Sequence, residues 1–200
     1  VLFRSSSAPL TDEGFTDQNP LFALLNPALY QDENGVQLPR PGAIVGYAFG
    51  KDTPKINRYL AMDRIMAVFP RNLKLLWGYK SINPDRSVYA LYAIKTLIND
   101  DKAPLTGEII VDARQDFDPV TNQPEVTMKM NAEGARIWKQ MTYEASKNED
   151  DKRCIAIVLD NYVYSAPVVQ AEISGGRSAI SGNDIDELRD LANILKAGKL

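Results

Sequence analysis

The last third of the chain constrains the fold most, because strand, turn and helix signals follow one another there. Residues 155–159 are an unbroken apolar run, and residues 162–169 form a second apolar segment. Asp160 and Asn161 lie between them and tolerate left-handed backbone, so the sequence predicts a two-residue hairpin. Pro167 cannot donate a ladder hydrogen bond, which predicts that the returning strand lies at an edge or is bulged there.

The segment after this hairpin predicts a turn, a strand and a terminal helix. Gly175 and Gly176 match the glycine pair of a phosphate-binding loop, but residues 177–180 are typical of a strand, so we expect a tight turn instead. Asn183 is expected to cap the last helix, and Gly198 follows its end. The predicted buried face of that helix comprises Ile185, Leu188, Leu191, Ala192 and Leu195.

The middle of the chain predicts a strand followed by a helix. Residues 125–130 alternate apolar and polar side chains, as in a half-buried strand, and Asn131 is expected to cap a helix over residues 131–147. We expect residues 106–113 to be extended and residues 116–124 to form a long loop. The apolar face of the helix comprises Ala135, Trp138, Met141, Thr142 and Ala145.

The first half predicts a smaller unit of helices and strands. Residues 1–42 are rich in proline and turn residues, apart from a short helix at 19–26 with Asn19 as its cap and Pro20 in its first position. Further along, the patterns predict a strand at 43–49, helices at 53–59 and 63–68, and an antiparallel pair of strands at 73–79 and 87–94.

A charged, turn-rich joint at residues 99–104 separates the two halves, so we expect domains at 1–105 and 106–200. Taken as a whole, the patterns predict an α+β fold, with antiparallel or mixed sheets and helices packed on one face.

The composition limits the chemistry. The 200 residues include no histidine, which removes the commonest general base and most zinc and copper sites. Cys154 is the single cysteine, so no internal disulfide can form, and we expect it to be a buried apolar residue rather than a reactive thiol. A net charge of −3 and a pI near 5.1 argue against nucleic acid or an anionic membrane as the main partner.

Membrane and signal segments are missing from the sequence as given. No apolar run approaches the roughly 20 residues that cross a bilayer, and the start does not resemble a signal peptide. Because the first residue is Val1 rather than methionine, we expect the chain to be a fragment whose membrane anchors lie outside it.

Acidic residues at 112, 116 and 118 are the nearest match to a metal or catalytic site. They lack the regular ligand spacing, the central glycine and the terminal glutamate of a calcium loop, so we predict no metal and no cofactor. A hydrolase that uses a carboxylate pair such as Asp112 and Asp116 is the enzymatic alternative. A periplasmic or surface adhesion module, which needs only a rigid scaffold, is a third class.

Several motifs occur in order along the second half of the chain: Thr106-Gly107, 124–135, 155–160, 164–167, 173–176, 180–182 and 187–198. Together these motifs resemble the SecD/SecDF protein-export family. The resemblance is strong over residues 106–200, while residues 1–105 are similar to the more variable front of the same periplasmic loop, as in Bacteroidetes-type fused SecDF proteins. The family has glycine after Asp160, where this chain has Asn161, which also tolerates positive φ. The motif residues are Thr106, Gly107, Gly134, Asp160, Pro167, Gly175, Gly176, Gly182 and Gly198.

The resemblance implies a soluble domain, the first periplasmic (P1) domain of a membrane-embedded translocase subunit at the bacterial inner membrane. Such a domain would bind unfolded preprotein emerging from the SecYEG channel and assist export driven by the proton-motive force. The family's proton-carrying residues belong to membrane helices, so none is assigned to this chain. The resemblance implies no enzymatic activity and no catalytic residue.

A domain that holds many different unfolded chains needs apolar surface or a free strand edge. We expect this surface within residues 1–105, and the strand that carries Pro167 is a candidate edge. Ordinary core packing is the alternative role for the same aromatic side chains. The candidate residues for polypeptide binding are Phe22, Tyr47, Phe49, Trp77 and Tyr79.

Overall fold

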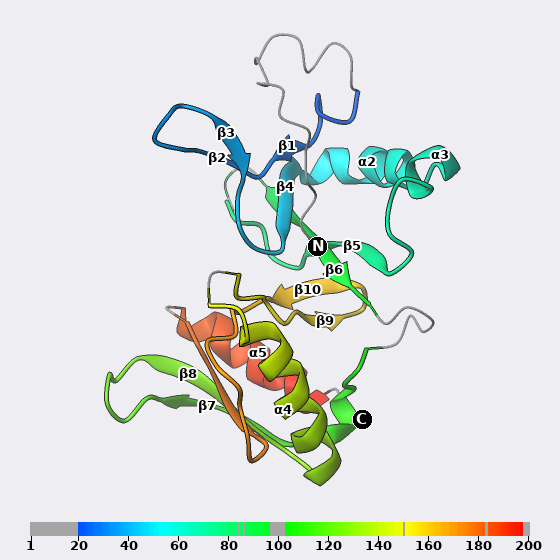
Figure 1. The fold of residues 1–200 in the computed structure, drawn as a ribbon. Coiled ribbons are helices and arrows are strands. Elements are labelled where there is room, and N and C mark those ends of the chain that lie inside the picture. The colour runs from blue at the N-terminus through cyan, green and yellow to red at the C-terminus, as the bar shows by residue number, and fades with distance from the viewer. Residues whose placement is uncertain are drawn as a thin grey trace. The chain divides into compact units, whose positions relative to one another are not determined.

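The computed structural model describes residues 20–83, 85, 87–96, 103–149, 151–182 and 184–197 (Figure 1). The chain divides after Ala93 into two compact units, which we call unit 1 and unit 2. Both units contain antiparallel strands and helices, which confirms the predicted α+β fold. Within the described residues, no helix has the length and apolar character needed to span a bilayer.

Unit 1 contains a sheet, and its helices follow strand β4 in the chain. The strands run in the order β1 (Asn26–Pro27), β4 (Ile44–Phe49), β6 (Val88–Lys95) and β5 (Leu73–Gly78). A separate hairpin pairs β2 (Leu29–Gln31) with β3 (Gln37–Pro39). After β4 come η1 (Gly50–Asp52), α2 (Thr53–Leu60) and α3 (Asp63–Met66) (Figure 1).

The core of unit 1 lies between α2 and one face of this sheet. Ile56, on α2, is completely buried and packs with Leu91 of β6 and Trp77 of β5. The indole Nε1 of Trp77 donates a hydrogen bond of 2.8 Å to Oδ1 of Asn57, so β5 is joined to α2 by a polar contact as well. Burying each large side chain contributes about 1.5–3 kcal/mol.

The predicted helix at residues 19–26 is wrong for the part that the structure describes. Residues 20–24 form a turn in which the amides of Leu24 and Leu25 both donate to the carbonyl of Leu21, and β1 follows at once. Helices this short are marginal by themselves, and pairing of Asn26 with Tyr47 of β4 takes the chain into a strand instead. Asn19, the predicted cap, lies outside the described residues.

The other predicted elements of unit 1 are present. The strand at 43–49, the helix at 53–59 and the two strands at 73–79 and 87–94 correspond to β4, α2, β5 and β6. β5 and β6 are neighbours in the sheet, and an antiparallel bridge joins Asn83 to Val88. The second predicted helix ends earlier than expected, at Met66 rather than at residue 68.

Unit 2 is a three-stranded antiparallel sheet with two helices on one face. Its strands run in the order β11 (Arg177–Ser181), β8 (Pro124–Met130) and β7 (Ile110–Phe117). α4 (Ala132–Ser146) and α5 (Ile185–Ala197) cover the face that carries Val126, Met128 and Met130 (Figure 1). A hairpin of β9 (Ile157–Leu159) and β10 (Tyr162–Ser165) lies between α4 and β11 in sequence.

The local signals around α4 and the hairpin are confirmed. Oδ1 of Asn131 accepts a hydrogen bond of 2.8 Å from the amide of Gly134, as an N-cap side chain does. Trp138, Thr142 and Ala145 are buried on the predicted face, and Ala135 and Met141 are half-buried. Asp160 and Asn161 both have positive φ, as the two-residue turn requires.

The boundaries of β7 differ from the prediction. Residues 107–109 form a short 3-10 turn, η3 (Gly107–Ile109), rather than extended chain. The strand then continues to Phe117, into the segment expected to be a loop, because its ladder with β8 extends to Pro124. The loop itself is residues 118–123, ordered by Oδ1 of Asp118, which accepts from the amides of Val120 and Thr121.

The hairpin is less buried than its apolar sequence suggests. β9 begins at Ile157 instead of residue 155, and Val158 is exposed. Its partner β10 ends at Ser165, so the candidate edge strand does not contain Pro167, and the register shifts between Val163 and Ser165. The run before the hairpin is held by an isolated bridge between Cys154 and Val168, which leaves Cys154 half-buried rather than buried.

The start of α5 also departs from the prediction. Asn183, the expected cap, lies outside the described residues, and Oδ1 of Asp184 accepts from the amides of Asp186 and Glu187. Ile185 is exposed, because it is the first helical residue and lies before the part of the helix that contacts the sheet. Of the rest of the predicted face, Leu188, Leu191 and Ala192 are buried, and Leu195 is half-buried against the same core.

The turn at Gly175 and Gly176 brings a backbone very close to α4. Both residues have positive φ, and a Cβ at Gly176 would lie 2.7 Å from Cβ of Ala135. The carbonyl of Gly176 accepts from the amide of Met130 at 2.8 Å, which joins the turn to the end of β8. No Cβ contact within 4 Å arises at Gly175, so only Gly176 combines the φ requirement with steric crowding.

We therefore expect Gly176→Ala to lower the free energy of unfolding more than Gly175→Ala. Each substitution strains a left-handed backbone, but only the first forces α4 or β11 to move, for an additional cost of about 1–3 kcal/mol. Chemical denaturation of both variants, followed by far-UV circular dichroism, measures the difference. Equal destabilisation of the two variants would contradict the crowding argument.

Candidate functional site

The five aromatic residues predicted for polypeptide binding do not lie on one surface. Trp77 belongs to the core of unit 1, where its indole is buried and hydrogen-bonded to Asn57. Phe22 is half-buried in the turn of residues 20–24, next to core residues. Tyr79 is exposed but follows the end of β5, two residues after Trp77. The remaining two, Tyr47 and Phe49, lie together on β4.

The face of the sheet that carries Tyr47 and Phe49 follows from the strand register. Successive side chains of a strand point to opposite faces, and Ala48 belongs to the core, so Tyr47 and Phe49 point away from it. Phe49 pairs with Val88 and Tyr47 pairs with Ala90, so these β6 side chains share that face.

Tyr92 extends the same face. It lies two residues beyond Ala90 on β6, and its ring is 3.3 Å from the position that a Cβ of Gly78 would occupy on β5. The absent side chain at Gly78 therefore leaves room for this ring. We define the aromatic face of unit 1 as Tyr47, Phe49, Val88 and Tyr92. Phe49 is 43% exposed, and the other three residues are half-buried.

The aromatic face presents apolar rings and one cation rather than a catalytic arrangement. Nζ of Lys51 lies 5.6 Å from the centre of the Phe49 ring, a cation–π distance. Such a surface gains free energy by burying nonpolar area against a partner, with little dependence on the partner's sequence. The arrangement is therefore suited to binding extended apolar segments.

Val88 and Tyr92 were not named as candidates from the sequence. Residues 88–94 are all apolar or aromatic, so no alternation in the sequence shows which of these side chains share a face. That face follows from the pairing of β6 with β4, which is a tertiary fact. The face of β4 that points outward is decided by which side α2 covers.

The motif residues have structural positions in unit 2. Gly134 is crowded, because a Cβ there would lie 2.7 Å from Cδ1 of Ile109. A Cβ at Gly182 would lie 3.2 Å from Cδ2 of Leu188 on α5. Thr106 directly precedes η3, which begins at Gly107. Gly198 lies outside the described residues. These positions bring elements into close packing, and none of them adds a polar group to a ligand site.

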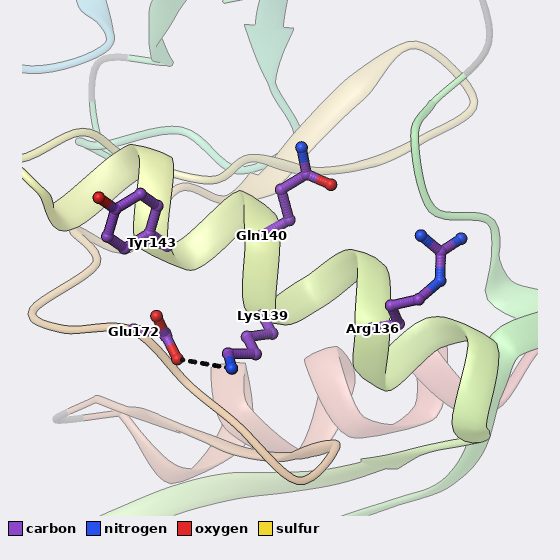
Figure 2. A pocket seen from close by; sticks show the side chains of 5 residues that line it. All are labelled: Arg136, Lys139, Gln140, Tyr143 and Glu172. Atoms are coloured by element: carbon purple, nitrogen blue, oxygen red, sulfur yellow. Dashed lines mark ion pairs between the residues drawn. The ribbon is translucent and has the colours of Figure 1, made fainter.

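A shallow depression of about 310 Å³ lies on the outer surface of α4 (Figure 2). It is lined by Arg136, Lys139, Gln140, Tyr143 and Glu172. Nζ of Lys139 pairs with Oε1 of Glu172 at 3.4 Å, while Arg136 and Gln140 point away from that pair (Figure 2). Because the side chains do not converge on a common point, the depression does not define a ligand site.

The acidic residues of β7 lie beside an arginine on one side of the strand. Asp112 and Asp116 share the solvent-facing side of the strand, with Arg114 between them, and Nε of Arg114 lies 3.5 Å from Oδ2 of Asp116. Among the described residues, no group of three or more histidine, cysteine, aspartate or glutamate side chains is placed to hold a metal.

Glu125 is a carboxylate in buried surroundings within the described part of the chain. It is only 8% exposed, on the side of β8 that faces away from the helices, and it pairs in the ladder with Asp116. Burial, followed by the negative charges of Asp118 and Asp116, raises the pKa of its carboxyl above the ordinary value. The ionised form of Glu125 therefore opposes folding.

Comparison with known proteins identifies the class of domain. Residues 86–200 match the family described as SecDF, P1 head subdomain. The chain belongs to this family, which confirms the resemblance seen in the motifs.

Two relatives show how far the similarity extends. The protein translocase subunit SecD of Rhodothermus marinus is 37% identical over 187 residues, which cover 92% of this chain and 26% of the relative. The subunit of the same name from Magnetococcus marinus is 34% identical over 174 residues, covering 82% of this chain and 31% of the relative. The chain thus spans between a quarter and a third of the length of these curated relatives.

Solved structures with SecDF in their titles are more distant. "Crystal structure of SecDF in Super-membrane-facing form" is 22% identical, with a TM-score of 0.41, over 88% of this chain and 24% of that one. "Structure and function of a membrane component SecDF that enhances protein export" is 20% identical, with a TM-score of 0.39, over 96% of this chain and 90% of that one.

The raised pKa of Glu125 predicts that Glu125→Gln stabilises the protein at neutral pH. In the unfolded chain the carboxyl titrates near its ordinary value of 4.5, so the wild-type fold loses stability as pH rises from there through the higher folded-state pKa. The gain from the substitution should therefore vanish at pH values below about 4. Denaturant titrations across pH measure it.

Glu144→Gln is the control with the opposite sign. Its hydrogen bond and charge attraction with Lys147 lower the pKa of Glu144, so its ionised form favours folding and that contribution is lost as pH falls. If both variants shift stability in the same direction at neutral pH, the assignment for Glu125 is wrong.

Proposed function

We propose that this chain is a periplasmic domain of a SecD-type translocase subunit, which holds unfolded polypeptide as it emerges from the SecYEG channel. Membership of the SecDF P1 head family carries this proposal, together with relatives named as protein translocase subunits. The whole subunit would be anchored at the inner membrane by segments outside this chain, and would use the proton-motive force to assist export.

Within this proposal the two parts of the chain have different roles. Residues 106–200 form the head segment that carries the family motifs, and residues 1–105 form a more variable lobe. The packing positions of Gly134, Gly176 and Gly182 support a rigid role for the head segment. The aromatic face of unit 1 supports a binding role for the lobe.

Holding and then releasing an exported polypeptide requires contacts that are weak and unselective. An exported chain presents many sequences in turn, so the holder must gain free energy from apolar area that most segments share, and it must release them. Full burial of a large apolar side chain contributes about 1.5–3 kcal/mol, and the partly exposed ring of Phe49 can add only a fraction of that. A few such contacts give a hold that is reversible.

The proposed function assigns no covalent chemistry to this chain. The polypeptide is gripped and released, and the energy for directed movement comes from proton flow through membrane helices of the subunit. The exposed ring of Phe49 beside Lys51 supports a contact surface for side chains of a passing segment, apolar or aromatic, rather than a site for one small molecule.

The test is binding of an unfolded secretory polypeptide to the chain, measured by fluorescence anisotropy, with a folded protein as the comparison. We expect the combined substitution Tyr47→Ala and Phe49→Ala to weaken binding about 5- to 10-fold, since about 1–1.5 kcal/mol of apolar contact is removed. The matched control is Phe117→Ala in unit 2, because Phe117 is 48% exposed, close to the 43% of Phe49.

Two results would count against the proposal. Unchanged binding by the Tyr47 and Phe49 variant would remove the aromatic face as the contact surface. Equal affinity for the folded and unfolded polypeptides would instead fit an adhesion module.

A further inference from the structure

A second exposed apolar feature of unit 1 lies where α3 ends. Met66 is 56% exposed and Val68 is 74% exposed. The amide of Val68 donates to the carbonyl of Ile65 at 3.1 Å, and the amide of Phe69 donates to the carbonyl of Met66 at 3.2 Å. These bonds continue the coil of α3 beyond its last residue.

Arginines flank this apolar pair in sequence. We define the α3 tip as Arg64, Met66, Val68 and Arg71, all of which are exposed. Ala67, between the apolar residues, is exposed as well, so residues 66–68 form a convex projection rather than the wall of a groove. Figure 1 shows α3 at the far end of the α2–α3 arm, next to the end of α2 that is farther from β4.

The surrounding segment is basic in a chain whose net charge is −3. Residues 51–74 contain six basic side chains and two acidic ones, a local excess of four positive charges. The basic residues are Lys51, Lys55, Arg58, Arg64, Arg71 and Lys74, and the acidic ones are Asp52 and Asp63.

The arginine charges near the tip are not neutralised by ion pairs within the described residues of unit 1. Arg58, Arg64 and Arg71 form no ion pair with any carboxylate in the part of the chain that the structure describes. Nη2 of Arg64 contacts Sδ of Met62 at 3.7 Å, which leaves its charge uncompensated. The positive charge of this segment is therefore available to attract an anionic partner.

We propose that the α3 tip docks on an anionic phospholipid surface. Met66 and Val68 would enter the boundary between headgroups and acyl chains, while Arg64 and Arg71 bind lipid phosphates. A convex apolar tip with flanking cations matches a lipid surface, which yields around inserted side chains. An acidic peptide would bind better in a groove, which can contact it on more than one side. This inference does not depend on the proposed binding of polypeptide at the aromatic face.

The test is co-sedimentation of the 200-residue chain with vesicles of two compositions. Binding is expected to vesicles of phosphatidylcholine mixed with phosphatidylglycerol, not to those of phosphatidylcholine alone, and it should weaken as salt is raised. We expect Met66→Ser with Val68→Ser, and separately Arg64→Gln with Arg71→Gln, each to weaken binding by roughly tenfold or more. Circular dichroism confirms that these exposed substitutions leave the fold intact.

The control is Phe117→Ser with Val120→Ser. These residues are an exposed apolar pair near the β7–β8 loop, beside the acidic Asp116 and Asp118. Vesicle binding should be unchanged in this variant. Equal loss in the control, or equal binding to both kinds of vesicle, would overturn the proposal. So would tip variants that keep full vesicle binding or that lose only the binding of unfolded polypeptide, which would assign the tip to a peptide instead.

Discussion

The close approach of the Gly176 backbone to α4 is the contact on which the arrangement of unit 2 depends. With Cβ of Ala135 so near, only a residue without a side chain lets β11 enter the sheet beside β8. Thr142, which is fully buried, supports the same approach, because its Oγ1 accepts from the amide of Ile173 at 2.9 Å. The chain from the hairpin to β11 is thereby held against the helix.

In unit 1 an aromatic residue, rather than a glycine, fixes the packing: one aromatic side chain lies in the core, while others lie on the opposite face of the sheet. Trp77 gives its indole to the core and to Asn57, and this fixes β5 against α2. One face of the resulting sheet packs against α2. The other face carries the buried Ala90 together with the half-buried Tyr47 and Tyr92 and the exposed Phe49. For the polypeptide binding that we propose, a rigid backing keeps the ordering needed at each encounter small.

Several elements could be predicted because their causes are local. The stereochemistry of Asp160 and Asn161, the capping geometry of Asn131 and the alternation across residues 125–130 all act between near neighbours in sequence. Predictions failed where distant pairing competes with local preference. Strand pairing to β4 replaced the predicted helix at residues 19–26, and the ladder with β8 extended β7 into a predicted loop.

The sequence by itself determined the fold class and the local turns, because turn stereochemistry and side-chain alternation are properties of short segments, and its motifs indicated the family. Only the tertiary structure decided which aromatic residues are core and which are surface. Trp77 and Tyr47 have similar strand contexts, and their separate roles arise because α2 covers one side of the sheet. That choice depends on contacts between residues far apart in the chain, which no local pattern specifies.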